Sequence, residues 1–514
     1  MFLCGSRAQE ECLVKLSIVD SSSGRALSGL VRIKDAEGKV IRPAQLMSRG
    51  MGLKDGEPLL DWSVLPKATT VELPHRKLTV EAIGGLETEA SKISIDLTGK
   101  SKADVRLSLL TFHNPREAGW RSANTHLHLM KISRDDCDRY LQEIPKADGL
   151  DMVFLSYLER AVADREYTSN RYTDDDLDGL TKASGVVFGN GEEHRHNFAG
   201  FGQGYGHVML LDIQKLIQPV SIGPGIMKEG TDGLPLRRGI ETARRDGAKV
   251  IWCHNNWGME SLPSWLDKKI HAQNIFDGGT HGSFKDSFYR YLNLGLHVPF
   301  STGTDWFMYD FSRVYVQMEE PLTVKNWLNG LAAGRNYITN GPLLELTVNG
   351  KDIGSTIRMT KSGELQVNAS GAGRLDFREL QVVVNGKVVK RQSTQKVGGH
   401  FEAKLQFKLL VDEPVWLALR TPPPMVKDDP ELQTRGTLNE AGRELFGHTS
   451  PIYVNVDGSG VWDQTTAKQI LAEMQANHKA IVENGKFEDA QAKARVLDVH
   501  GTAIDTLKAR IEQD

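Results

Sequence analysis

The feature that most constrains the fold is an alternation of two kinds of segment between residues 113 and 341. The first kind is a short apolar run typical of a buried strand, and the second is an amphipathic run with helical spacing. The apolar runs are GLDMVFLS (149–156), GVVFGNG (185–191), KVIWCHN (249–255) and HVPFSTGTD (297–305). The amphipathic runs are DDDLDGLTKAS (174–184), GLPLRRGIETARRDGA (233–248), SFKDSFYRYLNLGL (283–296) and TVKNWLNGLAAG (323–334). Strands that alternate with helices pair in parallel, so this region predicts a barrel or an open α/β sheet.

The regions on both sides of this alternation are rich in strand patterns. Residues 13–110 and 342–456 alternate apolar and polar side chains with period 2, with turn signals between the runs. This pattern is typical of a β-sandwich. The pair Asn385-Gly386 separates two apolar runs of the second region and predicts a tight hairpin turn.

Residues 463–514 predict a helical hairpin. Apolar residues fall on one face of each helix, and Asn484-Gly485 interrupts the pattern between them. The predicted buried positions are Ile470, Leu471, Met474, Ile481 and Val482 in the first helix, and Val496, Leu497, Ile504, Leu507 and Ile511 in the second. We expect this face to pack on the rest of the chain.

The predicted layout is a multidomain α/β protein, because 514 residues exceed what one hydrophobic core normally serves. The expected segments are an N-terminal remnant (1–12), a β-sandwich domain (13–112), a barrel (113–344), a second β-sandwich-like domain (345–458) and the helical hairpin (459–514).

Composition narrows the function classes. The formal net charge is −3 with 25% charged residues, and no basic stripe points to nucleic acid. No apolar run reaches the roughly 18 residues that a transmembrane helix needs. The four cysteines include no CxxC pair, which argues against a zinc-thiolate site or a disulfide framework. The expected partner is a small molecule, while the oligomeric state is not indicated.

The first residues, MFLCGSRAQEE, end a short apolar patch with Ser6-Arg7-Ala8 before Gln9. Small residues at these two places resemble a signal-peptidase site, although a charged n-region is missing. One interpretation is export to the periplasm or cell envelope, with the mature chain starting near Gln9. The other is a disordered N-terminus on a cytoplasmic protein.

Imidazoles and carboxylates follow the predicted strands, where the chemistry of α/β barrels is found. These residues are His126, His128, Glu192, Glu193, His194, Arg195, His196, His207, His254 and Asp305. Each alone has an ordinary explanation as a hydrogen-bonded core residue, a cap or a solvated charge. Together they are costly to bury unless a cation neutralises them. A donor set of His, Asp and Glu without thiolate suits Zn²⁺, Mn²⁺ or Fe²⁺.

The spacing of His126-Leu127-His128 supports this interpretation, because residues two apart on a strand point to the same side. The nearby run GFGQGYGH (200–207) has alternating glycines, and no helix pattern follows it, so a dinucleotide-binding motif is not favoured. We interpret it as a pliable loop that shapes substrate access.

Six motifs follow one another along the chain. They are NTHLH (124–128), GEEHR (191–195), GHVMLL (206–211), VIWCHN (250–255), STGTD (301–305) and AGRNYITNGPLL (333–344). In these motifs the chain resembles the PHP (polymerase and histidinol phosphatase) metallohydrolases, and within them the carbaryl-hydrolase (CehA/McbA) branch. The resemblance covers roughly residues 113–345. It implies a distorted (βα)7 PHP-type barrel that holds up to three metal ions, with β domains on either side.

The resemblance also implies two sets of metal ligands. One ion takes His126, His128, Glu193 and Asp305, and a second shares Glu193 and takes His207 and His254.

The ligands of a third ion are replaced in this chain. The expected Asp-His pair falls on Tyr157 and Leu158, and an expected histidine falls on Phe307. We therefore expect one or two ions, with these three side chains filling the space of the third.

The leading functional hypothesis is a hydrolase that uses a metal-activated hydroxide on an ester, carbamate or phosphoester. Arg195 lies two residues from Glu193 and is the candidate catalytic residue, because a cation there would stabilise developing negative charge. A structural salt bridge from Arg195 to Glu193 or Asp305 is an equal alternative.

The alternative function is a catalytically inactive PHP-like protein that binds a metal or a cell-envelope ligand. Asn255 and Asn256 either orient substrate or form a turn. Residues 339–342 of AGRNYITNGPLL are interpreted as a turn between the barrel and the following β domain rather than as catalytic groups.

Overall fold

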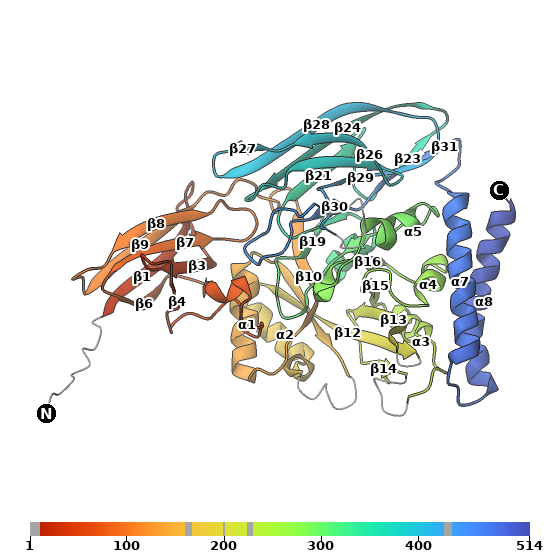
Figure 1. Ribbon diagram of the computed structural model, residues 1–514, viewed down its shortest axis with the longest axis horizontal. Helices are drawn as coiled ribbons and strands as arrows, with labels where there is room; N and C mark the ends of the chain where they lie inside the picture. Colours follow the sequence, from red (N-terminus) through yellow and green to blue (C-terminus); the bar gives the residue numbers. More distant parts are fainter. Residues whose placement is uncertain (1–10, 160–166, 199–200, 224–229, 426–433, 514) are drawn as a thin grey trace.

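The computed structural model describes residues 11–159, 167–198, 201–223, 230–425 and 434–513, and shows a mixed α/β protein rich in β-sheet. Figure 1 shows the N-terminal strands at one end, a curled central sheet with its helices in the middle, and two long C-terminal helices at the other end. The proposed cleavage site before Gln9 lies outside the described residues.

Residues 11–109 form two sheets around one core. One sheet contains β2 (Ala26–Leu27), β1 (Glu11–Asp20), β6 (Thr69–Pro74) and β9 (Lys102–Leu109). The other contains β4 (Val40–Ile41), β3 (Gly29–Lys34), β5 (Ser63–Leu65), β7 (Lys77–Ile83) and β8 (Ser91–Asp96), with η1 (Pro58–Asp61) before β5. Apolar side chains from both sheets share one buried cluster, as the period-2 pattern predicts.

The predicted N-terminal remnant (1–12) extends too far. Glu11 and Cys12 belong to β1, where Cys12 is fully buried and pairs with Leu73 of β6. The alternation of exposed and buried positions already begins at Glu11, so these residues are part of the fold.

The central sheet curls so that the end of its strand order returns to its beginning. Its strands are β10 (Trp120–His128), β11 (Met152–Tyr157), β12 (Val187–Phe198), β13 (Phe201–Leu211), β15 (Lys249–Cys253), β16 (Ala272–Asn274) and β17 (Phe300–Ser301). Every neighbouring pair in this series is parallel except β12–β13 and β13–β15. The next strand, β18 (Asp305–Trp306), pairs in parallel with β10. The short strand β14 (Ser221–Ile222) pairs with β12.

The run GFGQGYGH was predicted as a loop, and this prediction is wrong for residues 201–207, which belong to β13. Two residues separate β12 from β13, and a parallel crossover needs a dozen or more, so the pair is antiparallel. The glycines allow close strand contacts rather than mobility. A Cβ on Gly206 would lie 2.3 Å from the ring of Trp252.

Helices cover the outside of the curled sheet. They are α1 (Arg134–Ala147), α2 (Asp174–Ser184), α3 (Arg237–Arg245), α4 (Ser261–Leu266), η5 (Lys285–Tyr289), α5 (Arg290–Leu292) and α6 (Val324–Ala332). The short helices η3 (Thr168–Arg171) and η4 (Asp277–Gly279) lie in the connections after β11 and β16. The predicted helix at 174–184 is confirmed. It starts with a capping box between Thr173 and Asp176 and ends at Gly185 in the left-handed conformation.

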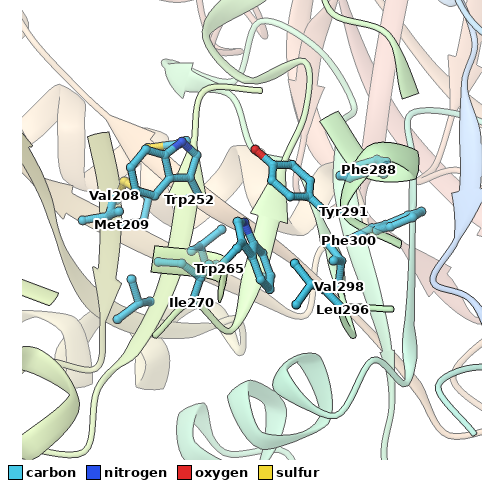
Figure 2. Packing of buried hydrophobic residues seen from close by; sticks show 14 of the residues in the cluster. Val208, Met209, Trp252, Trp265, Ile270, Phe288, Tyr291, Leu296, Val298 and Phe300 are labelled. Carbon is cyan, nitrogen blue, oxygen red and sulfur yellow. The ribbon is translucent and has the colours of Figure 1, made fainter. Parts of the chain in front are cut away.

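Large apolar side chains fill the space between the sheet and these helices. Figure 2 shows Trp252 of β15, Trp265 of α4 and Phe300 of β17 among them. Trp252 and Phe300 are fully buried and Trp265 is almost so, which makes this part of the sheet a rigid support for the residues at its rim.

The central sheet continues into the second β region. β19 (Arg313–Gln317) pairs with β10 and β20 (Asn336–Thr339), and β20 pairs with β30 (Gly447–Thr449). The same sheet includes β23 (Thr356–Met359), β25 (Glu379–Val384), β26 (Lys387–Ser393), β29 (Val415–Arg420) and β31 (Ile452–Val456). The predicted turn Asn385-Gly386 joins β25 to β26 as expected.

A separate five-stranded sheet lies over this region. Its order is β22 (Lys351–Asp352), β21 (Leu343–Val348), β24 (Gly363–Gly373), β28 (His400–Val411) and β27 (Gln395–Val397). The predicted boundary between residues 344 and 345 falls inside β21.

The helical hairpin is present as α7 (Gln464–Asn484) and α8 (Ala490–Gln513), and Gly485 caps the first helix. Most predicted inward positions are buried or partly buried against the main core. Val482 is an exception at 40% exposure. Its neighbour Ile481 is fully buried, and adjacent helical residues lie about 100° apart around the axis, so Val482 points in a different direction from Ile481. No helix in the described part of the chain is long and apolar enough to span a membrane.

Candidate metal centre

Four potential metal ligands come together from two strands and from the first residue of a third. His126 and His128 project from β10, Glu193 from β12, and Asp305 begins β18. The Nε2 atoms of the two histidines lie 3.0 Å apart, and His128 Nε2 lies 3.2 Å from Glu193 Oε2. Asp305 Oδ1 is 3.4 Å from His126 Nε2 and 3.5 Å from His128 Nε2. All four side chains are buried.

The glycine of STGTD makes this approach possible. A Cβ on Gly303 would lie 2.7 Å from the Cβ of His126, so the segment before Asp305 fits against β10 only without a side chain there.

A second group forms on the other oxygen of Glu193. Glu193 Oε1 lies 3.5 Å from His207 Nδ1 and 3.7 Å from His254 Nε2. The strand register explains the approach, because His207 of β13 lies opposite both Arg195 of β12 and Cys253 of β15. Glu193 therefore lies between the two groups, with one oxygen facing each.

The six residues predicted as metal ligands thus meet at one place. The structure forms two groups from them, and both match the sets that the sequence motifs implied: His126, His128, Glu193 and Asp305, and Glu193, His207 and His254. Potential ligand atoms within each group lie within 4.8 Å of one another.

Hydrogen bonds on the far side of the imidazoles fix their orientation. His126 Nδ1 lies 2.9 Å from Asp277 Oδ2, and His128 Nδ1 lies 3.0 Å from the carbonyl oxygen of Ser156. His254 Nδ1 donates to Asp277 Oδ1. A carboxylate or a carbonyl accepts from Nδ1–H, so each ring turns the lone pair of Nε2 toward the centre.

Asp277 is the functional residue that the sequence reasoning missed. It begins η4 just after β16, which was too short to be recognised as a strand. The available signal was an aspartate after a strand of the same parallel series. A Cys253-containing group around Asp277 also places four potential ligands together. Burial raises the pKa of the Cys253 thiol well above its usual value, so this group serves better as support than as a metal site.

Two acceptors in the centre are buried without any hydrogen-bond partner among the described residues. They are Glu193 Oε1 and Asp305 Oδ1. In addition, the lone pairs of His126 Nε2 and His128 Nε2 face each other across 3.0 Å. Such an arrangement is unfavourable unless a proton or a cation lies between these atoms.

The pKa shifts of the buried groups also indicate that the centre favours added positive charge. Burial lowers the pKa of His126, but Asp305 and Asp277 outweigh it and raise the net value. Burial likewise lowers the pKa of His254, and Asp277 raises it well above the usual value. Burial raises the pKa of Asp305. Without a metal, the centre therefore attracts protons, which a divalent cation would displace.

The distances fit a small divalent ion. Bonds of about 2.1 Å to Zn²⁺ place neighbouring atoms of a tetrahedral shell about 3.4 Å apart. The His126–His128, His128–Glu193, His126–Asp305 and His128–Asp305 separations are 3.0, 3.2, 3.4 and 3.5 Å, and the His126–Glu193 separation is 3.9 Å. The residues present therefore fit a metal ion bound by nitrogen and oxygen donors.

Arg195 lies beside the centre rather than within it. Its Nη1 is 3.6 Å from Glu193 Oε1, which makes an ion pair at a distance longer than a hydrogen bond. Burial raises the pKa of Glu193, yet the Arg195 charge and the neighbouring histidines bring it well below its usual range. The salt bridge that was one of the two interpretations of Arg195 is present.

The Phe307 ring packs against residues outside the two candidate ligand groups. Phe307 has a positive φ of 51°, and its ring centroid lies 5.9 Å from that of Tyr140 of α1. It also occupies the space beside Gly52, where a Cβ would lie 2.1 Å from the ring. The aromatic side chains next to His128 are instead Tyr167 and Trp306, with ring centroids at 5.6 and 5.5 Å.

The asparagines of the motifs have structural partners. Asn255 donates to Thr280 Oγ1 and accepts from the backbone N–H of Phe276, which fastens the segment around Asp277. Asn340 donates to Asp310 Oδ2 and accepts from the N–H of Phe446. Both side chains hold loops in place.

No protein-family model, curated protein or solved structure matches this chain. The likeness to the PHP metallohydrolases therefore depends on the motifs and on the positions of their residues.

Proposed function

We propose that this protein is a metal-dependent hydrolase of the PHP type that acts on an ester, carbamate or phosphoester. The observation that carries the proposal is the position of Glu193. Its two oxygens face two separate groups of imidazoles, and one of those oxygens is buried without a hydrogen-bond donor from any residue that the structure describes. A shared carboxylate of this kind suits a pair of cations and has no evident structural purpose.

His126, His128, Glu193 and Asp305 would hold one ion, and Glu193, His207 and His254 a second. A divalent ion bound here supplies a Lewis acid and lowers the pKa of a coordinated water toward neutrality. Asp277 acts through the histidines. It accepts from Nδ1 of His126 and His254 and keeps both rings turned toward the centre.

Arg195 is the residue best placed to stabilise developing negative charge. Its ion pair with Glu193 holds the guanidinium at the centre, while its Nε is buried without a hydrogen-bond partner among the described residues. A substrate oxyanion would provide that partner. Replacement of the third set of ligands favours esters and carbamates over phosphate monoesters.

The first test is metal analysis of the purified protein combined with a substrate screen. We expect one or two ions per chain, and chelator-sensitive hydrolysis of at least one aryl ester, carbamate or phosphodiester. The His126→Ala variant should lose metal and activity while its circular dichroism spectrum is unchanged. His113→Ala is the control, because His113 is half-exposed and lies outside the candidate centre.

Three results would overturn the proposal: three ions per chain, full activity in His126→Ala, or activity that survives removal of all metal. A protein that binds metal but hydrolyses none of the substrate classes would support the alternative of an inactive, ligand-binding relative.

A further inference from the structure

A cavity of about 640 Å³ lies where three distant parts of the chain meet. Its walls come from η5 and α5, from the turn between β25 and β26 with the end of β29, and from α7. Figure 1 shows α5 beside the upper part of α7, below the strands of the second β region. None of the six candidate metal ligands lines this cavity, so it is separate from the metal centre.

Arg420 is held in this cavity by a chain of hydrogen bonds. Its Nε donates to Gln381 Oε1 at 2.8 Å, and its Nη1 donates to the hydroxyl of Tyr289 at 2.8 Å. The Tyr289 hydroxyl in turn lies 2.8 Å from His448 Nε2, and His448 Nδ1 lies 2.9 Å from the carbonyl oxygen of Thr449. The carbonyl needs a donor, so Nδ1 carries hydrogen and Nε2 accepts from Tyr289.

This series of hydrogen bonds fixes the Arg420 guanidinium in place and does not neutralise its positive charge. Burial together with the Arg420 charge lowers the pKa of His448 to about 3, so the imidazole stays neutral and keeps its acceptor role. Tyr289 and His448 are buried, and neither supplies an anion to Arg420. The remaining N–H groups of the fork are therefore fixed in place before any ligand arrives.

The predicted hairpin turn forms another wall. Asn385 Oδ1 accepts from the backbone N–H of Trp416 at 2.9 Å, and a Cβ on Gly386 would lie 3.6 Å from the ring of Tyr289. The turn therefore sits directly on Tyr289, and Lys387, the next residue, lines the cavity together with Arg420.

The cavity is lined by more cationic side chains than there are carboxylates paired with them. Arg290 pairs with Glu473, and Asp286 accepts from Ser283. A neighbouring cavity of about 850 Å³ shares Gly386, Lys387, Arg420 and Pro423 with the first, and there Arg391 pairs with Glu379. Within the described ranges, Lys285, Lys387 and Arg420 have no carboxylate within the 4.0 Å of an ion pair.

We propose that this cavity is a binding site for a small organic anion that carries a carboxylate, phosphate or sulfate group. Arg420 binds the anionic group through its fixed fork, and Lys387 and Lys285 add charge at the rim. A guanidinium fork matches the oxygen pairs of such anions, and the volume is in the range of small-ligand sites.

Isothermal titration calorimetry of the full-length protein at low ionic strength tests this site, with inorganic phosphate, sulfate and citrate as separate probes. We expect at least one probe to bind, and the preferred probe identifies the anionic group. Arg420→Gln should weaken binding about tenfold or more, and Lys387→Gln should weaken it severalfold. Lys390→Gln is the matched control, because it removes the same charge from the same hairpin outside both cavities.

Two further arms keep the outcome decisive. Binding should persist in His126→Ala, which separates this site from an anion site at the metal centre. Lys387 is exposed, so its variant reports on binding even if Arg420→Gln folds poorly. The proposal is overturned if millimolar probe gives no binding, if Lys387→Gln and Lys390→Gln behave alike, or if His126→Ala abolishes binding.

Discussion

Both faces of β12 carry a buried glutamate near a histidine, but the two carboxylates differ in how fully they are hydrogen-bonded. On one face, Glu192 Oε1 lies 2.7 Å from His194 Nδ1, and Glu192 Oε2 accepts from the backbone N–H of Ile217 at 2.8 Å. Arg238 Nη2 donates to His194 Nε2 at 3.4 Å. On the other face, Glu193 faces four histidines and Arg195, yet its Oε1 has no hydrogen-bond donor among the described residues.

This contrast shows what separates a structural polar cluster from a candidate metal centre. Residue type does not, because both faces present a buried glutamate beside a histidine. What differs is whether the neighbouring backbone and side chains complete the hydrogen bonds. The Glu192–His194 pair has its hydrogen bonds within the protein, whereas Glu193 Oε1 has no hydrogen-bond donor in the described part of the chain and is placed to meet a cation.

The largest expected effect is on metal affinity, and it should be seen only for the face that carries Glu193. Glu193→Gln should lower metal affinity more than a hundredfold, because it removes the charge that both groups share. The metal-free variant should be less stable than the metal-free parent, because Arg195 and the histidines hold the pKa of Glu193 well below its usual range and so stabilise the folded state through the ionised carboxylate. Metal titration and thermal unfolding with chelator measure both. Parental metal affinity in this variant would mean that Glu193 is not a metal ligand.

A smaller loss of metal affinity is expected when the change is made at Asp277, which contacts the histidine ligands rather than the ion. Asp277→Asn should reduce metal affinity about ten- to a hundredfold, because an amide can accept from only one of the two imidazoles that Asp277 now orients. Competition with a chromophoric chelator gives the affinity. Asp178→Asn, an exposed change on α2, controls for the loss of one charge. Equal affinities in the two variants would contradict the role of Asp277.

The opposite face should respond in stability alone. Glu192→Gln should lower the free energy of unfolding by about 1–3 kcal/mol, because the amide cannot satisfy both His194 and the Ile217 N–H. Metal content should stay at the parental value. Denaturant unfolding of metal-free protein and metal analysis are the measurements. Loss of metal in this variant would erase the distinction between the faces.

The smallest effect concerns pH and His196, on the same face as Glu192. Burial lowers the pKa of His196 to about 3, with a smaller contribution from His194. The neutral ring therefore favours the folded state above pH 6.5, the usual value, and this stability is lost as the pH falls toward 3. At pH 5 the loss is about 2 kcal/mol. His196→Gln should reduce the difference in unfolding free energy between pH 7 and pH 5 by this amount, and an unchanged difference would refute the assignment.

Much of the layout follows from local patterns. The helix at 174–184 and the Asn385-Gly386 turn depend on nearby residues, and both are present. The helical hairpin was predicted from its periodicity, with an error only at Val482. The β13 error arose because glycine signals both loops and close strand contacts, and a local pattern does not distinguish them.

The sequence by itself determined which residues are available for a metal: two histidines at strand spacing in β10, a glutamate in β12, and later histidines and an aspartate after strands. Only the tertiary structure decided that Asp277 orients two of the rings, that Glu192 pairs with His194, and that Arg420 lies in a cavity. The physical reason is that strand periodicity fixes which residues share a face, while the curl of the sheet fixes which faces meet. Satisfaction of a buried polar atom depends on neighbours that are far away in the chain.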